Sequence, residues 1–203
     1  MLKQTKAPRK LQEGLGKALA VIPLTPNQWT LLSLLVALGA AAMVASGNLI
    51  YGLVLFALAA IFDLVDGAVA RARGEVTALG GFIDGVADRF VEALFLFSFM
   101  FYPLPTVYLD PKIWLAALIF LGTCMPAFIR AYADHKGVIS HEKALALGGI
   151  CERSERLIIV ILGLAVGLAY CMSFFVYSII LASGLSLVTL LQRTTEIVRS
   201  GRG

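Results

Sequence analysis

Four aspartates interrupt a chain that otherwise consists largely of long apolar stretches. Asp63, Asp66, Asp84 and Asp88 all fall in the segment DLVDGAVARARGEVTALGGFIDGVADR, residues 63–89. An ionised carboxylate within a membrane span costs about 2.5–3.5 kcal/mol on insertion scales, unless a cation or a water-filled cavity compensates it. Four such groups need a strong compensating charge, and a divalent cation is the simplest one.

Composition places the chain among membrane proteins. Of its 203 residues, 59% are hydrophobic and 15% are charged, whereas a soluble domain carries about a quarter charged residues. At roughly 20 residues per span, the uncharged stretches predict an all-α, polytopic membrane protein with six transmembrane helices. The predicted spans are 27–46, 49–72, 77–102, 112–136, 153–171 and 173–198.

The distribution of lysine and arginine predicts the orientation. The positive-inside rule puts both termini, the 72–77 turn and the 130–156 loop on the cytoplasmic side of the cell membrane. Residues 8–22 combine cations with leucines at helical spacing, which predicts a short interfacial amphipathic helix. We expect a single domain over residues 1–203, with the six helices in 27–199. The net charge of +4 is concentrated on the cytoplasmic side, where the cations would face anionic lipid headgroups and phosphorylated substrates. No nucleic-acid partner is expected.

The spacing of the aspartates puts them on two helix faces. Asp63 and Asp66 are three residues apart and Asp84 and Asp88 are four apart, so each pair shares one face of its helix. Because the connecting turn is short, the two helices should be antiparallel neighbours whose carboxylates converge. Hard oxygen ligands of this kind suit Mg²⁺ or Mn²⁺. Arg71 follows on the same helix, where it could meet a phosphate near the metal.

The same residues form the pattern DxxDGxxAR, then eight residues, then GxxxDxxxD. Gly67 and Gly80 remove side chains beside the carboxylates, which lets a flat ligand or a neighbouring backbone come close. This pattern resembles the signature of the CDP-alcohol phosphatidyltransferase family and matches it without a departure. The resemblance implies a six-helix, homodimeric membrane enzyme with two metal ions. Such an enzyme transfers a substituted phosphoryl group from a CDP-linked donor to an alcohol and releases CMP.

The resemblance also assigns roles to individual residues. It implies that the four aspartates bind two Mg²⁺ ions, with Mn²⁺ as the alternative, and that Asp88 is also the catalytic base for the acceptor hydroxyl. For Asn27 and Thr30, at the start of the first span, helix capping is the alternative to nucleotide contact. The residues expected to bind the nucleotide are Asn27, Thr30, Asp66, Gly67, Ala70, Arg71 and Gly80.

Arginines at the cytoplasmic ends of the last three spans suggest a site for the acceptor's phosphate, since arginine binds phosphate in a bidentate manner. Ordinary positive-inside flanking is the alternative. The segment GGICERSERLIIV, residues 148–160, resembles a stretch of the phosphatidylinositol phosphate synthases of this family, with Cys151 and Ser154 replacing family-typical residues. Tyr132 stands where those enzymes often carry a cation. The resemblance implies that the phosphate of inositol 1-phosphate is bound by Arg130, Arg153, Arg156 and Arg193.

The expected reaction moves a phosphatidyl or archaetidyl group from a CDP-lipid to the phosphorylated polyol inositol 1-phosphate, as a step of phospholipid biosynthesis. Two alternatives keep the metal site: glycerol 3-phosphate as the acceptor, or CDP-inositol as the donor. A membrane prenyltransferase also uses aspartate–Mg²⁺ clusters, but its motifs lack this spacing. A cation transporter should carry ionisable residues through the whole bilayer, whereas the opposite half of these spans is uncharged.

Overall fold

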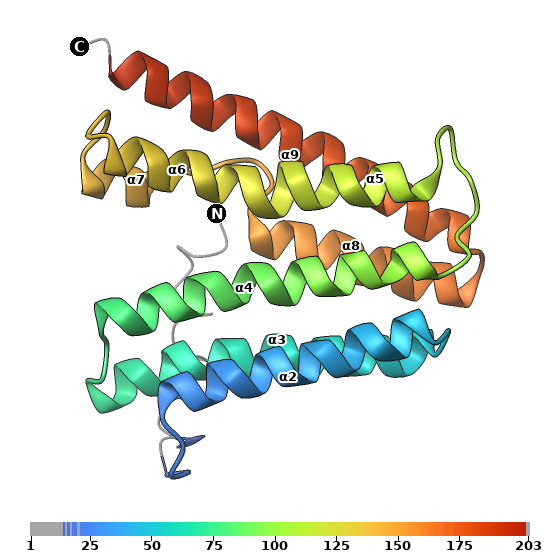
Figure 1. The fold of residues 1–203 in the computed structure, drawn as a ribbon, viewed down its shortest axis with the longest axis horizontal. Coiled ribbons are helices and arrows are strands. Elements are labelled where there is room, and N and C mark those ends of the chain that lie inside the picture. Colours follow the sequence, from blue (N-terminus) through green and yellow to red (C-terminus); the bar gives the residue numbers. More distant parts are fainter. Residues whose placement is uncertain (1–13, 15, 17, 20, 202–203) are drawn as a thin grey trace. The chain divides into compact units, whose positions relative to one another are not determined.

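The computed structural model describes residues 14, 16, 18–19 and 21–201, which form helices and no β-strand. The helical segments agree closely with the predicted spans, so the all-α prediction is confirmed (Figure 1). They are α2 (Pro26–Ala45), α3 (Leu49–Arg73), α4 (Ala78–Ser98), α5 (Pro111–Leu118), α6 (Met125–His135), α7 (His141–Ala146), α8 (Arg153–Ala169) and α9 (Met172–Ser200). The short 3-10 helix η2 (Phe99–Phe101) extends α4, and the π-helix η3 (Ile119–Cys124) joins α5 to α6.

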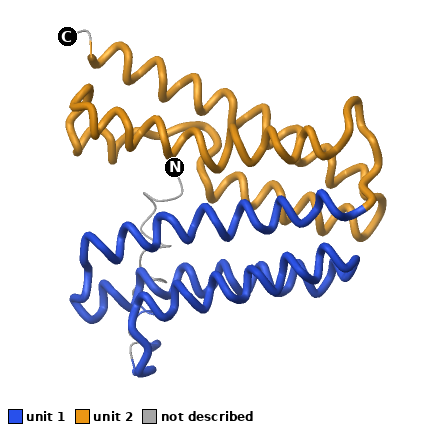
Figure 2. The backbone as a smooth tube through the Cα atoms, viewed as in Figure 1, with its two compact units in different colours: residues 1–102 blue, residues 103–203 orange. Residues whose placement is uncertain are grey.

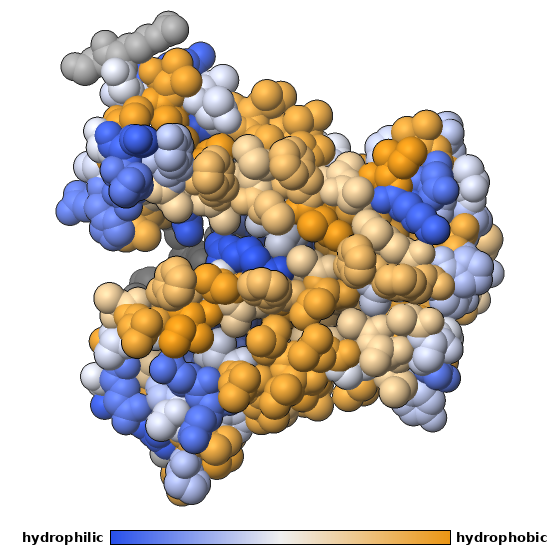
Figure 3. Space-filling view, in the orientation of Figure 1, coloured by the Kyte–Doolittle hydropathy of each residue, from blue (hydrophilic) through white to orange (hydrophobic). Residues whose placement is uncertain are grey.

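Among the described residues, four helical segments are long and apolar enough to cross a membrane: Pro26–Ala45, Leu49–Arg73, Pro111–His135 and Met172–Ser200. They indicate a multi-pass membrane protein. The helix α4 carries four charged residues, and α8 is only 17 residues long. The face in Figure 3 is largely hydrophobic along the helices, with hydrophilic residues toward their ends. The predicted interfacial helix at 8–22 lies mostly outside the described residues.

The chain forms two compact units, residues 1–102 and 103–203 (Figure 2). In the first unit, α2 packs along both α3 and α4. The rings of Phe56 on α3 and Phe95 on α4 stack with their centroids 3.8 Å apart, and Phe99 meets Phe95 edge-on. All three rings are almost completely buried. This aromatic core joins α3 to α4 along the helix face that also carries the acidic residues of α4.

The turn between α3 and α4 is closed by two local devices. Gly74 ends α3 with a φ of 69°, a left-handed conformation that glycine adopts without a Cβ clash, and its N–H donates to the carbonyls of Ala70 and Arg71. Thr77 then caps α4, because its hydroxyl accepts from the N–H of Gly80 at 3.0 Å. The resulting connection is short, so the aspartates of α3 and α4 stay close to a common turn.

The second unit is built on an antiparallel hairpin of α8 and α9, with α5, η3 and α6 packed against α9. Two glycines of α8 allow the close approach. A Cβ at Gly163 would lie 1.9 Å from Ser178 Oγ, and one at Gly167 would lie 3.0 Å from Phe175 Cβ. This Gly-x-x-x-Gly contact is typical of membrane helices that pack closely. The π-helix is a local departure of the kind that often marks functional sites.

Candidate active site

Three of the four aspartates converge in the first unit. Asp63 and Asp66 of α3 and Asp84 of α4 each offer a carboxylate oxygen, and these oxygens lie within 4.8 Å of one another. Asp66 is buried, at 3% exposure, and the other two are half-buried. Like charges this close repel strongly where water is scarce, unless a cation lies among them. Three converging hard oxygen donors therefore fit Mg²⁺ or Mn²⁺.

Thr30 supports this cluster from α2. Its hydroxyl donates to Asp66 Oδ2 at 2.6 Å, in a buried hydrogen bond, while the N–H of Gly67 donates to Asp66 Oδ1. The capping alternative for Thr30 does not hold, because the N-cap of α2 is Thr25, which forms a capping box with Gln28. In this structure Thr30 orients a predicted metal ligand, as residues behind a metal's direct ligands commonly do.

The other residues predicted for the nucleotide also lie in the first unit, close to the carboxylates in sequence or space. A Cβ at Gly67 would lie 3.2 Å from Arg71 Nη1, so the guanidinium folds over this glycine. A Cβ at Gly80 would lie 3.6 Å from Asn27 Oδ1, so the first turns of α2 and α4 approach each other. Ala70 directly precedes Arg71, and both lie in the last turn of α3.

Asp88 is not part of the three-carboxylate group among the described residues. It lies one turn beyond Asp84 on α4, half-buried, with Oδ2 3.6 Å from Arg89 Nη1. The sequence reasoning missed Arg89, and it also missed Glu92, which lies one further turn along and is 2% exposed. The sequence does carry a signal for Glu92. An acidic residue four positions after Asp88, inside an apolar run, costs free energy in a membrane unless it has a partner, and so indicates a specific role.

The predicted acceptor arginines belong to the second unit. Arg193 on α9 is 8% exposed. Its Nη1 donates to the carbonyl of Pro126 at 3.0 Å and its Nε to that of Gly148 at 3.3 Å, and Nη2 lies 3.8 Å from Glu152 Oε1. Arg193 thus links α9 to α6 and to the connection that precedes α8.

Arg156, in the first turns of α8, is also buried, at 4% exposure. Its side chain runs across the π-helix: a Cβ at Gly122 would lie 2.8 Å from Arg156 Cδ and 3.0 Å from Ser186 Oγ. Arg130 on α6 and Arg153 at the start of α8 are half-buried. The four arginines are thus carried by three helices of the second unit: Arg130 by α6, Arg153 and Arg156 by α8, and Arg193 by α9.

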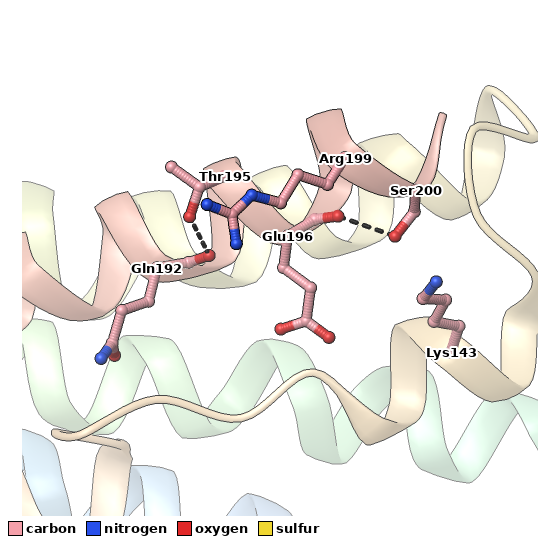
Figure 4. A pocket seen from close by; sticks show the side chains of 6 residues that line it. All are labelled: Lys143, Gln192, Thr195, Glu196, Arg199 and Ser200. Carbon is pink, nitrogen blue, oxygen red and sulfur yellow. Dashed lines mark hydrogen bonds between the residues drawn. The ribbon is translucent and has the colours of Figure 1, made fainter. Parts of the chain in front are cut away.

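A pocket of about 480 Å³ lies between α7 and the end of α9 (Figure 4). The hydroxyl of Thr195 donates to the carbonyl of Gln192, and that of Ser200 donates to the carbonyl of Glu196. These hydroxyls are thus bonded within their own helix. The lining residues are Lys143, Gln192, Thr195, Glu196, Arg199 and Ser200, and they include none of the residues predicted for the site.

Comparison with known proteins agrees with this geometry. The family model of the CDP-alcohol phosphatidyltransferases matches residues 23–191. An archaetidylinositol phosphate synthase of Pyrococcus horikoshii is 34% identical over 91% of this chain and 89% of its own length. A phosphatidylinositol phosphate synthase of Corynebacterium glutamicum is 31% identical over 93% of this chain and 84% of its own length.

A solved structure has the same fold. The phosphatidylinositol phosphate synthase of Mycobacterium tuberculosis with CDP-DAG bound superposes with a TM-score of 0.76 at 24% identity, covering 93% of this chain and 94% of that one. The structure of the same synthase in complex with manganese and citrate superposes with a TM-score of 0.73, covering 92% of this chain and 88% of that one. The chain belongs to the CDP-alcohol phosphatidyltransferase family. It is a membrane-embedded transferase of phospholipid biosynthesis, as the sequence predicted.

Proposed function

We propose that this enzyme transfers a phosphatidyl or archaetidyl group from a CDP-lipid to the hydroxyl of inositol 1-phosphate and releases CMP. The observation that carries the proposal is the convergence of Asp63, Asp66 and Asp84 in a chain with the complete family signature. The choice of acceptor is supported by the two relatives named as inositol phosphate lipid synthases, which match at 34% and 31% identity over most of their length.

The carboxylates are proposed to hold two Mg²⁺ ions, with Mn²⁺ as the alternative. When bound, such ions neutralise the diphosphate and stabilise the charge that develops on the departing CMP. Asp63, Asp66 and Asp84 supply the converging oxygens, and Asp88 is the proposed fourth ligand. The Thr30 hydroxyl keeps Asp66 in one orientation through its 2.6 Å hydrogen bond.

The remaining residues of the first unit are proposed to bind the donor. The Arg71 guanidinium donates hydrogen bonds to the diphosphate. Gly67 leaves room for this guanidinium, because a Cβ at position 67 would press on it. Gly80 and Asn27 bind the donor at the point where the first turns of α2 and α4 approach each other. Ala70 presents a small side chain beside Arg71. Asp88 takes the proton from the acceptor hydroxyl as that oxygen bonds to phosphorus.

The acceptor's phosphate is proposed to bind Arg130, Arg153, Arg156 and Arg193. Arg153 and Arg156 lie in the first turns of α8, where the positive end of the helix dipole also favours an anion. Burial of Arg156 and Arg193 restricts their side chains, so less conformational entropy is lost when a phosphate binds.

We further propose that all six long helical segments span the membrane, in one domain that acts as a homodimer. In this topology the ends of α3 and α9 face the cytoplasm together with both termini, because the cations of the chain concentrate in those connections. The donor's lipid chains stay in the bilayer while soluble substrates arrive from the cytoplasmic side.

The test is CMP release by the purified protein, with donor and acceptor varied independently. The donors are CDP-diacylglycerol, CDP-archaeol and CDP-inositol; the acceptors are inositol 1-phosphate, glycerol 3-phosphate and unphosphorylated inositol. We expect release with a CDP-lipid plus inositol 1-phosphate in Mg²⁺, and none from Asp84→Asn, the background control. Preference for glycerol 3-phosphate, or activity with CDP-inositol in place of the CDP-lipid, would overturn the assignment in favour of one of the two alternatives.

A further inference from the structure

We propose that Thr189, assisted by Gln192, is a positioning residue for the acceptor site. The two side chains fasten the main chain of residues 150 and 151 to α9 and thereby fix the first turn of α8. This inference rests on the proposed function, because it takes Arg153 and Arg156 as ligands of the acceptor's phosphate. Neither Thr189 nor Gln192 is itself proposed to touch a substrate.

The Thr189 hydroxyl contacts both main-chain groups of Cys151. It accepts a hydrogen bond from the Cys151 N–H at 2.9 Å. Two carbonyl oxygens lie within reach of its own hydrogen, that of Leu185 at 3.0 Å and that of Cys151 at 3.4 Å. Thr189 and Cys151 are each only 1% exposed. A buried N–H needs a partner within the protein, and Thr189 provides one for Cys151.

Two neighbouring side chains of α9 extend this attachment. Gln192 Oε1 accepts from the Ile150 N–H at 3.2 Å, and Arg193 Nε donates to the Gly148 carbonyl at 3.3 Å. Residues 189, 192 and 193 share one helix face, so main-chain groups of residues 148, 150 and 151 are all held by the same face of α9.

The fit between the connection and α9 is close. A Cβ at Gly149 would overlap Thr189 Cγ2, so a larger residue there would force the connection or the threonine side chain to shift. The threonine methyl therefore fills the space that any larger residue at 149 would need. The backbone of the connection lies directly against α9, and the Thr189 side chain sets how close it comes.

The attachment lies immediately before the proposed phosphate ligands. Cys151 is followed by Glu152, the N-cap of α8, whose carbonyl accepts from the Arg156 N–H at 3.0 Å. Arg153 is only two residues from Cys151. A shift of the connection would move both arginines, and a misplacement of about 1 Å can cost on the order of 100-fold in rate.

The experiment compares Thr189→Val, which keeps the shape but loses the hydroxyl, with Thr189→Ser, which keeps the hydroxyl. We expect the valine variant to raise the KM for the phosphorylated acceptor by about tenfold, because a buried N–H loses its partner. The KM for the CDP-lipid should stay unchanged, and the serine variant should restore the acceptor KM. The matched control is Thr194→Val, since the Thr194 hydroxyl donates to Leu190 within its own helix at 2.8 Å.

Two results would overturn the inference. One is an unchanged acceptor KM in folded Thr189→Val; the other is an equal rise of both KM values that serine does not rescue, which would indicate a merely structural role. If Thr189→Val does not fold, Gln192→Met should show the same selective rise in acceptor KM, and its absence would count equally against the inference.

Failure of the proposed function is separately visible in the wild type. If the wild-type enzyme prefers another phosphorylated polyol, the proposed acceptor is wrong and the same comparison is made with that polyol. If the wild type accepts only unphosphorylated alcohols, both proposals fall.

Discussion

Replacing Thr30 by valine tests whether Asp66 needs its hydroxyl partner to hold a metal ion. Valine keeps the branched shape of threonine but loses the donor that lies 2.6 Å from Asp66 Oδ2. A hydrogen bond to a charged group contributes about 1.5–3 kcal/mol, and loss of a partner behind a metal ligand typically weakens metal affinity about 10- to 100-fold. The two magnitudes agree, since each tenfold change corresponds to about 1.4 kcal/mol.

The assay is CMP release as a function of Mg²⁺ concentration. We expect Thr30→Val to need roughly 10- to 100-fold more Mg²⁺ for half-maximal rate, with much of the rate regained at saturation. The matched control is Ser33→Ala, one turn along α2, which removes a buried hydroxyl that donates to the Ala59 carbonyl at 2.9 Å. It should leave the Mg²⁺ dependence unchanged. Equal Mg²⁺ requirements in Thr30→Val and wild type would refute the reasoning.

Two further predictions concern charge and packing. Asp84→Asn removes one of three crowded carboxylates, so without metal the thermal midpoint of the variant should rise by roughly 2–4 °C per kcal/mol of repulsion relieved. Adding Mg²⁺ should then raise the midpoint of the variant by less than it raises that of the wild type. An equal rise in both proteins would contradict the metal site. Gly163→Ala places a Cβ against Ser178 and should cost about 1–3 kcal/mol through overpacking, seen as a lower thermal midpoint in detergent. Gly184→Ala is its control, because a Cβ there meets nothing within 4 Å, and equal midpoints for the two would contradict the packing argument.

The first unit could be predicted well from the sequence because its determinants are local. The i, i+3 and i, i+4 spacing of the aspartates, the short turn at Gly74 and the uncharged stretches each act within one or two helices. Together they predicted helix bounds close to those of α2 and α3 and the convergence of Asp63, Asp66 and Asp84.

The contacts that the sequence did not reveal join residues far apart in the chain. The sequence indicates a cap or a nucleotide contact for Thr30 and gives no sign that its hydroxyl reaches Asp66, 36 positions later. Thr189 and Cys151 are 38 positions apart, and nothing in their local patterns indicates the pairing. A polar residue in an apolar helix signals that a partner exists, but only the packing of the helices identifies it. The number of membrane spans stays a prediction for α4 and α8, because the charges of α4 and the shortness of α8 weaken the hydropathy signal.

The central claim is that carboxylates from α3 and α4 jointly hold the divalent cation on which transfer depends. It is tested most directly by measuring CMP release from a CDP-lipid and inositol 1-phosphate after complete chelation, followed by titration with Mg²⁺. We predict that chelation abolishes release and that Mg²⁺ restores it saturably in wild type but not in Asp63→Asn or Asp84→Asn. Full activity in the chelated enzyme, or normal Mg²⁺ restoration in both variants, would contradict the claim.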